Sequence, residues 1–228
     1  MQISKTALLI GLLGLLLATV GCSQTIIGAA LPDPARAPVD LAADGYGIVA
    51  GFDDAPVQIE IFTEPQCTHC RDLQHDFGDQ LAYYITVGKL QVTYRPLIFM
   101  DDDYDGYSSE VANALFLAAE PASGATVTGT QFQRFVEDLW VNQQIGGPPF
   151  TGEELRDMAI RSGLPDSVAD NIARQDEAVD VADMEEANFE LLFDIDPGQT
   201  GTPTVYDLDA GEKLDIYDDN WLEDLVQS

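Results

Sequence analysis

The stretch that decides the fold is residues 57–70, Val-Gln-Ile-Glu-Ile-Phe-Thr-Glu-Pro-Gln-Cys-Thr-His-Cys. Aliphatic side chains occupy every second position over 57–61, a pattern typical of a short β-strand of mixed burial. A loop of four residues then leads into a C-x-x-C pair, Cys67 and Cys70. The order predicts a strand that delivers two cysteines to the start of the next element.

That next element is predicted to be a helix. Apolar residues recur at helical spacing and make one stripe that ends near Gly88: Leu73, Phe77, Leu81 and Tyr84. Cysteines three apart in a helical turn lie roughly 5 Å apart at Cα, within disulfide range. Free backbone N–H groups and the helix dipole favour an anion at the first position. We therefore expect Cys67 to have a lowered pKa and act as nucleophile, and the deeper Cys70 to resolve the mixed disulfide.

His69 lies between the cysteines. An imidazole that donates to the Cys67 sulfur, or is charged near it, would stabilise the thiolate and make the disulfide a stronger oxidant. The alternative is an exposed side chain without effect.

The rest of the chain predicts an α/β fold with a helical insertion. A second strand is expected at 90–100, helices at 108–119, 130–143, 152–162 and 166–193, a hairpin at 204–208 and 213–217, and a last helix at 220–226. This order suits a sheet flanked by helices, with an insertion at about 107–195 between the second strand and the C-terminal hairpin. We expect one domain over 46–228, preceded by a flexible tether at 22–45.

Three blocks of sequence resemble the DsbA-like thiol–disulfide oxidoreductases of the thioredoxin superfamily. They are Asp54-Ala55-Pro56-Val57, Phe62 with Cys67-Thr68-His69-Cys70, and Gly201-Thr202-Pro203-Thr204-Val205, and the likeness covers roughly 47–227. The resemblance implies a thioredoxin-like fold, a redox-active Cys67–Cys70 disulfide and no cofactor. It also implies a cis Thr202–Pro203 bond packed against that disulfide, with the Thr202 backbone free to pair with an extended substrate.

The sequence departs from the family pattern in three places. Thr68 stands where proline is common, and Pro65 replaces a common aromatic residue. Ile61 occupies the position, six before the first cysteine, where many members carry an acid, and the neighbouring Glu60 is expected to face the other way. Fold and thiol exchange survive these changes, while the rate and direction of exchange stay open.

The N-terminus is typical of an exported protein. Lys5 precedes an apolar run over 7–20, too short for a comfortable membrane span, and residues 1–21 are interpreted as a signal peptide. Thr19-Val20-Gly21-Cys22 resembles a bacterial lipobox, which implies cleavage before Cys22 and a lipid anchor on its sulfur. The expected location is therefore extracytoplasmic, on a bacterial membrane. An uncleaved anchor, or secretion with Cys22 free, is the alternative.

Composition limits the partners and the kinds of cysteine site that the chain can have. The chain carries 10 Lys and Arg against 40 Asp and Glu, a net charge of −30, which argues against nucleic acid and anionic membrane surfaces as partners. We interpret the acidity as a solvated, self-repelling surface suited to high salt. Of three cysteines, two form the C-x-x-C pair, and none is left for a structural disulfide or a four-cysteine zinc site.

A second motif, Asp101-Asp102-Asp103-Tyr104-Asp105-Gly106, has the opening pattern of a calcium loop. The position that should close the loop with a bidentate glutamate holds Ala112. An acidic, solvated turn is favoured, and no metal is assigned.

The leading hypothesis is a monomeric enzyme that oxidises cysteine pairs in unfolded or reduced exported proteins. A membrane redox partner would reoxidise it. A reductase for another exported protein is the first alternative. A copper- or zinc-binding module that uses Cys67, His69 and Cys70, and an inactive binding domain, are the others.

Overall fold

The computed structural model describes residues 37–101, 105–120 and 125–227. Six strands form one mixed sheet in the order β1-β2-β4-β3-β5-β6. The strands are β1 (Val39–Leu41), β2 (Ile48–Ala50), β3 (Val57–Thr63), β4 (Leu90–Pro96), β5 (Thr204–Asp207) and β6 (Glu212–Lys213). The helices are α2 (Thr68–Thr86), α3 (Tyr107–Ala119), α4 (Gly129–Val141), α5 (Gly152–Arg161), α6 (Asp166–Ile172), α7 (Val181–Ile195) and α8 (Trp221–Gln227).

The two central strands, β3 and β4, run parallel, and every other pair in the sheet is antiparallel. β4 is buried along its whole length, and β3 buries its carboxyl half. Antiparallel pairing of β5 with β3 places Thr204 opposite Phe62. The chain just before β5 therefore lies beside the carboxyl end of β3, where the C-x-x-C motif begins.

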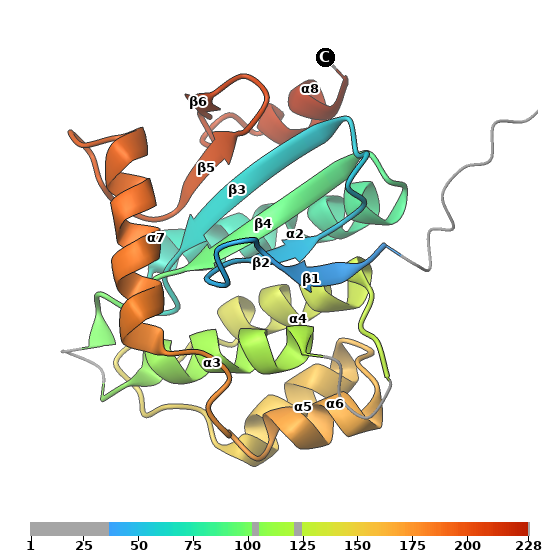
Figure 1. Cartoon of the computed structure of the whole chain (residues 1–228), viewed down its shortest axis with the longest axis vertical. Coiled ribbons are helices and arrows are strands. Elements are labelled where there is room, and N and C mark those ends of the chain that lie inside the picture. The colour runs from blue at the N-terminus through green and yellow to red at the C-terminus, as the bar shows by residue number, and fades with distance from the viewer. Residues whose placement is uncertain (1–36, 102–104, 121–124, 228) are drawn as a thin grey trace, which may run out of the picture. The chain divides into compact units, whose positions relative to one another are not determined.

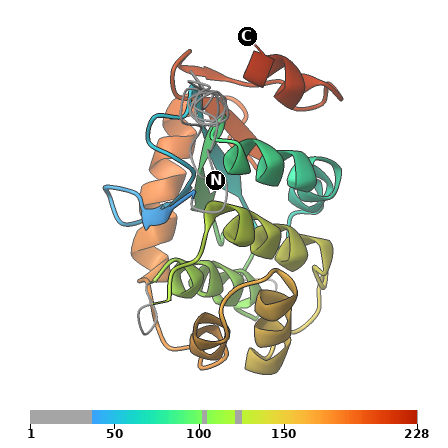
Figure 2. The ribbon, with the colours of Figure 1, turned by 90° about the vertical axis from the view of Figure 1, so that its right-hand side faces the viewer.

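Helices cover both faces of the sheet. Figure 1 shows α7 across one face and α2 behind the other, and the perpendicular view in Figure 2 agrees. α8 lies on the α2 side, where the rings of Trp221 and Phe77 meet edge to face with centroids 5.5 Å apart. The arrangement has the layers of a thioredoxin-like α/β fold, as the sequence predicted.

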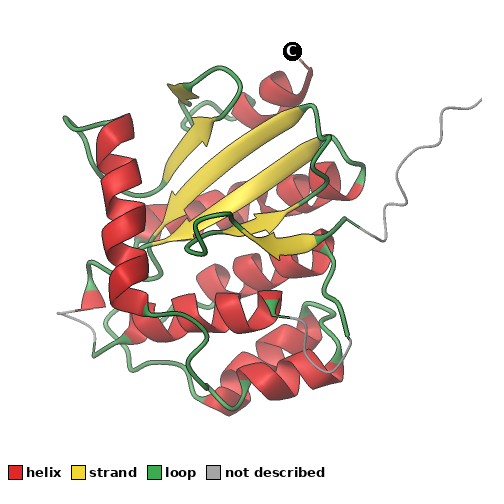
Figure 3. Ribbon diagram, viewed as in Figure 1, coloured by secondary structure: helices red, strands yellow, loops and turns green. Residues whose placement is uncertain are grey.

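The predicted insertion at about 107–195 comprises α3 to α7, of which α3 to α6 pack below the sheet in the view of Figure 3 and α7 crosses one of its faces. Among the helices of the insertion, α4 makes the most extensive contact with α2. Threonines begin two of these helices: Thr128 and Thr151 each accept a hydrogen bond from a backbone N–H at the N-terminus of α4 and α5. Gln131 and Glu154 complete the two capping boxes.

The single helix predicted at 166–193 is wrong, because the structure has two helices, α6 and α7, with a loop between them. Asn113 of α3 binds this loop, donating to the Asp176 carbonyl at 3.0 Å and accepting from the Ala178 N–H at 2.8 Å. Asp180 then caps α7 by accepting from two backbone N–H groups. Asn113, which is distant in sequence, thus stabilises the loop that separates α6 from α7.

The domain begins earlier than predicted. Residues 37–45 were expected in the flexible tether, yet Ala37 is buried and its carbonyl accepts from the Gly129 N–H at 2.7 Å. β1 pairs with β2, and β2 pairs with β4. Each of these strands is only three residues long, so the pairing rather than the local sequence defines them.

Two other boundaries differ from the prediction. β4 ends at Pro96, which cannot donate to a ladder, rather than at residue 100. The last strand is two residues long; the Leu214 N–H still donates to the Val205 carbonyl, and 215–217 leave the sheet. The predicted signal peptide and the predicted lipidation site, Cys22, lie outside the described residues, as do positions 102–104 of the acidic turn. Within the described residues, no helix has both the length and the apolarity needed to cross a membrane.

Candidate active site

Cys67 is the N-cap residue of α2, in extended conformation at φ −73° and ψ 119°. Its N–H donates to the Glu64 carbonyl at 3.0 Å, and its own carbonyl accepts from the Arg71 N–H at 3.2 Å. Cys67 is partly exposed, whereas Cys70, in the first turn, has no exposed surface. Both cysteines are free thiols in this structure. The geometry matches the predicted helix start, with one thiol accessible and one enclosed.

The surroundings of Cys67 favour its thiolate. The pKa of Cys67 is lowered to about 5, and the largest cause is a hydrogen bond from the Cys70 thiol. The Thr202 side chain and the backbone N–H groups of Cys70 and His69 lower it further, and burial opposes them. Free N–H groups at a helix N-terminus stabilise an anion in this way.

Cys70, by contrast, is kept as a neutral thiol. Burial raises its pKa well above the ordinary value, and the hydrogen bond and the charge of Cys67 raise it further. The Glu64 N–H points at its sulfur at 3.5 Å. The pair is thus divided into an accessible thiolate and an enclosed thiol.

The loop before β5 lies against Cys67. The Thr202–Pro203 bond is cis, as the resemblance implied. The Cys67 Sγ atom lies 3.2 Å from the Thr202 carbonyl oxygen, to which its thiol form donates. Residues 201–204 also line a hollow of about 470 Å³, together with the 213–217 segment. The structure therefore brings together Cys67, Cys70, Thr202 and Pro203.

His69 is exposed. Its backbone N–H, rather than its imidazole, is what lowers the pKa of Cys67. Within the described residues, no group of three or more His, Cys, Asp or Glu side chains is placed to hold a metal ion. Asp101 of the acidic turn binds the start of α3, accepting from the N–H groups of Ser108 at 2.6 Å and Ser109 at 2.8 Å.

Glu64 belongs to the site although no sequence pattern indicated it. Its side chain is fully buried beside the motif, accepting from the Gln66 N–H at 2.6 Å and from the Ser108 hydroxyl. Glu60, by contrast, pairs with Arg95 on the opposite face of β3 from the buried Ile61, as expected. The burial of Glu64 depends on α3, so no local signal revealed it.

Glutamine side chains hold the loop before Cys67 in place, a second feature that no sequence pattern indicated. Gln66 donates to the Gln144 carbonyl at 3.1 Å and accepts from the Gly146 N–H at 3.0 Å. Gln143 donates to the carbonyls of Pro65 at 2.6 Å and Cys67 at 3.1 Å. The loop after α4 thus fixes the motif from the side of the helical insertion.

Comparisons with known proteins agree with this geometry. A thioredoxin family model matches residues 43–190. The chain therefore belongs to the thioredoxin family. None of the curated proteins compared with the chain matches it.

Solved structures share the fold. The MdbA thiol-disulfide oxidoreductase from Corynebacterium matruchotii is 20% identical, with a TM-score of 0.66 over 83% of this chain and 92% of that one. MdbA from Corynebacterium diphtheriae is 22% identical, with a TM-score of 0.65 over 83% and 94%. DsbA from Chlamydia trachomatis is 18% identical, with a TM-score of 0.56 over 78% and 87%. The fold is that of DsbA- and MdbA-type oxidoreductases, which confirms the resemblance drawn from the sequence.

Proposed function

We propose that this protein is an exported thiol–disulfide oxidoreductase that oxidises cysteine pairs in secreted or envelope proteins. The observation that carries the proposal is the difference between the two sulfurs, an accessible Cys67 with a pKa of about 5 and a fully buried Cys70. A stabilised thiolate favours the reduced enzyme, so the disulfide form accepts electrons readily from substrate thiols. The solved structures of this fold carry the same class name.

The reaction has two exchanges. A substrate thiolate attacks the Cys67 sulfur and expels Cys70, which leaves a mixed disulfide between substrate and Cys67. The second substrate thiolate then attacks the substrate sulfur of that bond and expels Cys67 as a thiolate. A low leaving-group pKa speeds this second step. In the reductive direction Cys70 would attack instead, and its raised pKa disfavours that role.

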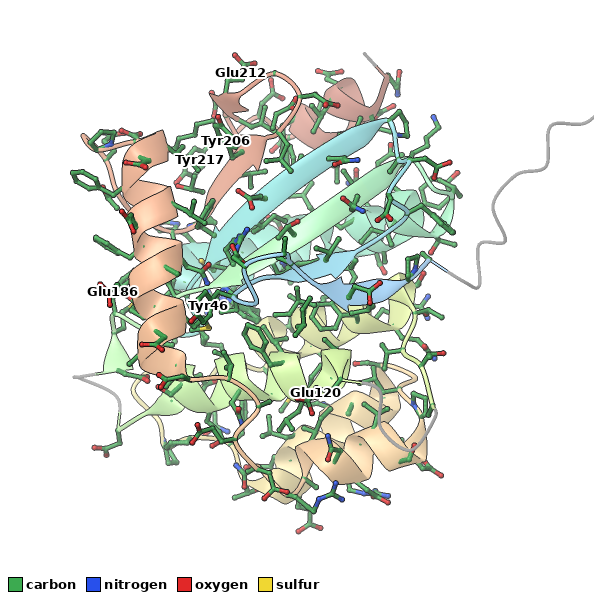
Figure 4. All side chains as sticks on the ribbon, viewed as in Figure 1. Tyr46, Glu120, Glu186, Tyr206, Glu212 and Tyr217 are labelled. Carbon is green, nitrogen blue, oxygen red and sulfur yellow. The ribbon has the colours of Figure 1, made fainter. Side chains whose placement is uncertain are left out.

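The hollow beside Thr202 and Pro203 is the proposed place for an extended substrate segment. It borders the loop that contacts Cys67 and is open to solvent on the side of Tyr217, which is 78% exposed and labelled in Figure 4. We propose that the Thr202 backbone pairs with the substrate and that Pro203 packs against the disulfide. Anchoring through a lipid on Cys22, a monomeric state and reoxidation by a membrane partner belong to the same proposal.

One assay separates the alternatives. The purified protein is tested for restoring activity to a reduced, unfolded enzyme and for reducing insulin, with Cys67→Ser as control and metal content measured. The oxidase predicts fast oxidation and slow insulin reduction. The reverse order of rates would establish the reductase. Inactivity with one equivalent of bound metal would establish the metal-binding module, and inactivity without metal the inactive binding domain.

A further inference from the structure

Helix α7 carries an apolar stripe that the rest of the described chain leaves exposed. Its members, Phe189 and Phe193, are 42% and 48% exposed, whereas phenylalanine side chains are usually buried. Residues four apart lie one above the other on the same side of a helix, so the two rings are neighbours. Within the described residues, neither ring packs against the hydrophobic core or against another aromatic ring.

The stripe is separate from the side of α7 that packs on the sheet. On that side, Leu192 joins Phe62 in a small hydrophobic cluster, and Asn188 is fully buried. Phe189 and Phe193 each follow one of these α7 residues, so they lie about 100° further around the helix. They line a hollow of about 610 Å³ along α7, larger than the hollow of the proposed substrate site. α7 is therefore held to the sheet without the two phenylalanines.

Acidic side chains border the stripe. Glu186, Glu190 and Asp194 recur at the same four-residue spacing, and all three are exposed. In Figure 4, Glu186 lies on the side of α7 that faces away from the sheet. Within the described residues, none of these three carboxylates forms an ion pair or a hydrogen bond. The apolar stripe is therefore flanked by a row of unpaired negative charges.

These charges decide which occupant fits the stripe. A second copy of the chain would bring the same carboxylates and a net charge of −30, so two such stripes would repel each other. An anionic lipid surface is repelled for the same reason. A helix with an apolar face and lysine or arginine beside it would cover the rings and pair with the carboxylates at once. Helices bind one another through rows of apolar side chains at this spacing.

We propose that the side of α7 formed by Phe189, Phe193, Glu186 and Glu190 is a docking site for a basic amphipathic helix of a partner protein. Apolar side chains of that helix cover the two rings, and its lysine or arginine side chains pair with the two glutamates. With 15 residues, α7 is roughly 22 Å long, enough to contact about four turns of a partner helix. The proposal goes beyond the proposed function and does not depend on the cycling of the cysteines.

The test measures the binding of a fluorescent peptide to the purified protein in about 0.15 M NaCl, which screens distant charges. The peptide has about 18 residues, long enough to form a helix, with leucine on one face and lysine on the other. The control peptide has the same composition, with the leucines spread around the helix. Wild type should bind the first peptide at least about tenfold more tightly than the control peptide. Equal affinities would show attraction between opposite charges alone and would overturn the proposal.

Substitution of the two rings tests the apolar part of the site. Phe189→Gln combined with Phe193→Gln should weaken binding of the first peptide by at least about tenfold, because the apolar contact is lost. Glutamine is a good helix former, so α7 should persist. The matched control is Tyr83→Gln combined with Ile160→Gln, which removes two exposed apolar side chains from α2 and α5 and should bind as wild type does. Equal losses in the two double variants would overturn the proposal.

Substitution of the glutamates tests the charged part, and it keeps the proposal falsifiable if the first double variant does not fold. Glu186→Gln combined with Glu190→Gln should weaken binding about fivefold and make it less dependent on NaCl. Glu153→Gln combined with Glu223→Gln changes the net charge equally, on α5 and α8, and should have a smaller effect. Similar losses in these two double variants would attribute binding to the overall charge and overturn the proposal.

Two further measurements address the other occupants. Sedimentation velocity detects a second copy, and flotation with phosphatidylcholine vesicles detects a lipid surface. Wild type should be a monomer and should not float. A dimer, or vesicle binding, that Phe189→Gln combined with Phe193→Gln abolishes would assign the stripe to that occupant and overturn the proposal.

Discussion

The Sγ atom of Cys67 lies 3.2 Å from the carbonyl oxygen of Thr202, a residue 135 positions further along the chain. Antiparallel pairing of β5 with β3 produces this contact by bringing the start of β5 to the carboxyl end of β3. That carbonyl accepts only from the neutral thiol, whereas the Thr202 side chain lowers the pKa of Cys67 and so favours the thiolate. The loop before β5 is therefore part of the environment that makes Cys67 a thiolate.

Thr202→Val should raise the pKa of Cys67 by about one unit, because a hydrogen bond to a charged group contributes about 1.5 kcal/mol or more. The measurement is the pH dependence of Cys67 alkylation. Thr200→Val is the matched control, since the Thr200 hydroxyl donates to the Asp196 carbonyl rather than contacting Cys67. Equal pKa values in the two variants would contradict this role for Thr202.

The two cysteines should differ in the effect of substitution. Cys67→Ser removes the accessible nucleophile and should lower the rate of disulfide exchange by about three orders of magnitude or more. Cys70→Ser keeps Cys67 and should accumulate mixed disulfides when it is given substrates that carry a disulfide, because Cys67 can still attack them and the reductive exchange has lost the enzyme thiol that would release it. Non-reducing electrophoresis distinguishes them. Mixed disulfides in Cys67→Ser and none in Cys70→Ser would reverse the assigned roles.

Arg95→Met should destabilise the fold by about 3–5 kcal/mol, because it leaves buried charge unpaired. The Arg95 side chain, 8% exposed, pairs with Glu60 and Asp44 and reaches Asn188 of α7. Asn188 also donates to the carbonyls of Pro96 and Tyr46, the latter labelled beside α7 in Figure 4.

The control for this prediction is Arg156→Met, which breaks an exposed pair with Asp170 and should cost far less stability than Arg95→Met. Urea unfolding gives both values. Similar losses in the two variants would show that the Arg95 network does not hold the sheet and α7 together.

Salt should stabilise the protein. With 40 acidic against 10 basic residues, self-repulsion opposes the compact state. Raising NaCl from about 0.1 M to about 1 M shortens the screening length from about 10 Å to about 3 Å. The midpoint of thermal unfolding should therefore rise as NaCl is added. Sucrose at the same osmolarity should raise the midpoint less, because it does not screen charge. A midpoint that tracks osmolarity alone would contradict the interpretation.

The sequence predicted the parts of the site that local patterns encode. Alternation over 57–61, the apolar stripe from Leu73 and the C-x-x-C spacing define β3, α2 and the cysteine pair within one stretch. The likeness of the Gly201–Val205 block to a known family supplied the cis bond before Pro203.

The parts it missed depend on contacts between distant segments. β1 and β2 are too short to leave a pattern and exist through their pairing with β4. The break between α6 and α7 is held by Asn113, more than 60 residues away. In the sequence Glu64 is an ordinary loop acid. Only the fold brings the Ser108 hydroxyl of α3 to its carboxyl and the Trp140 indole of α4 to its backbone carbonyl.

The pH at which Cys67 ionises in the reduced protein is the most direct test of the account. Thiolate absorbance against pH gives this value, and the rate of alkylation of Cys70→Ala against pH gives the value that remains without the Cys70 thiol. The midpoint should lie near pH 5 in wild type, so that Cys67 is a thiolate at neutral pH, and should be higher in Cys70→Ala, which lacks the largest cause of the lowering, while staying below that of free cysteine. A wild-type midpoint at or above about 8.5, the value of free cysteine, would contradict it.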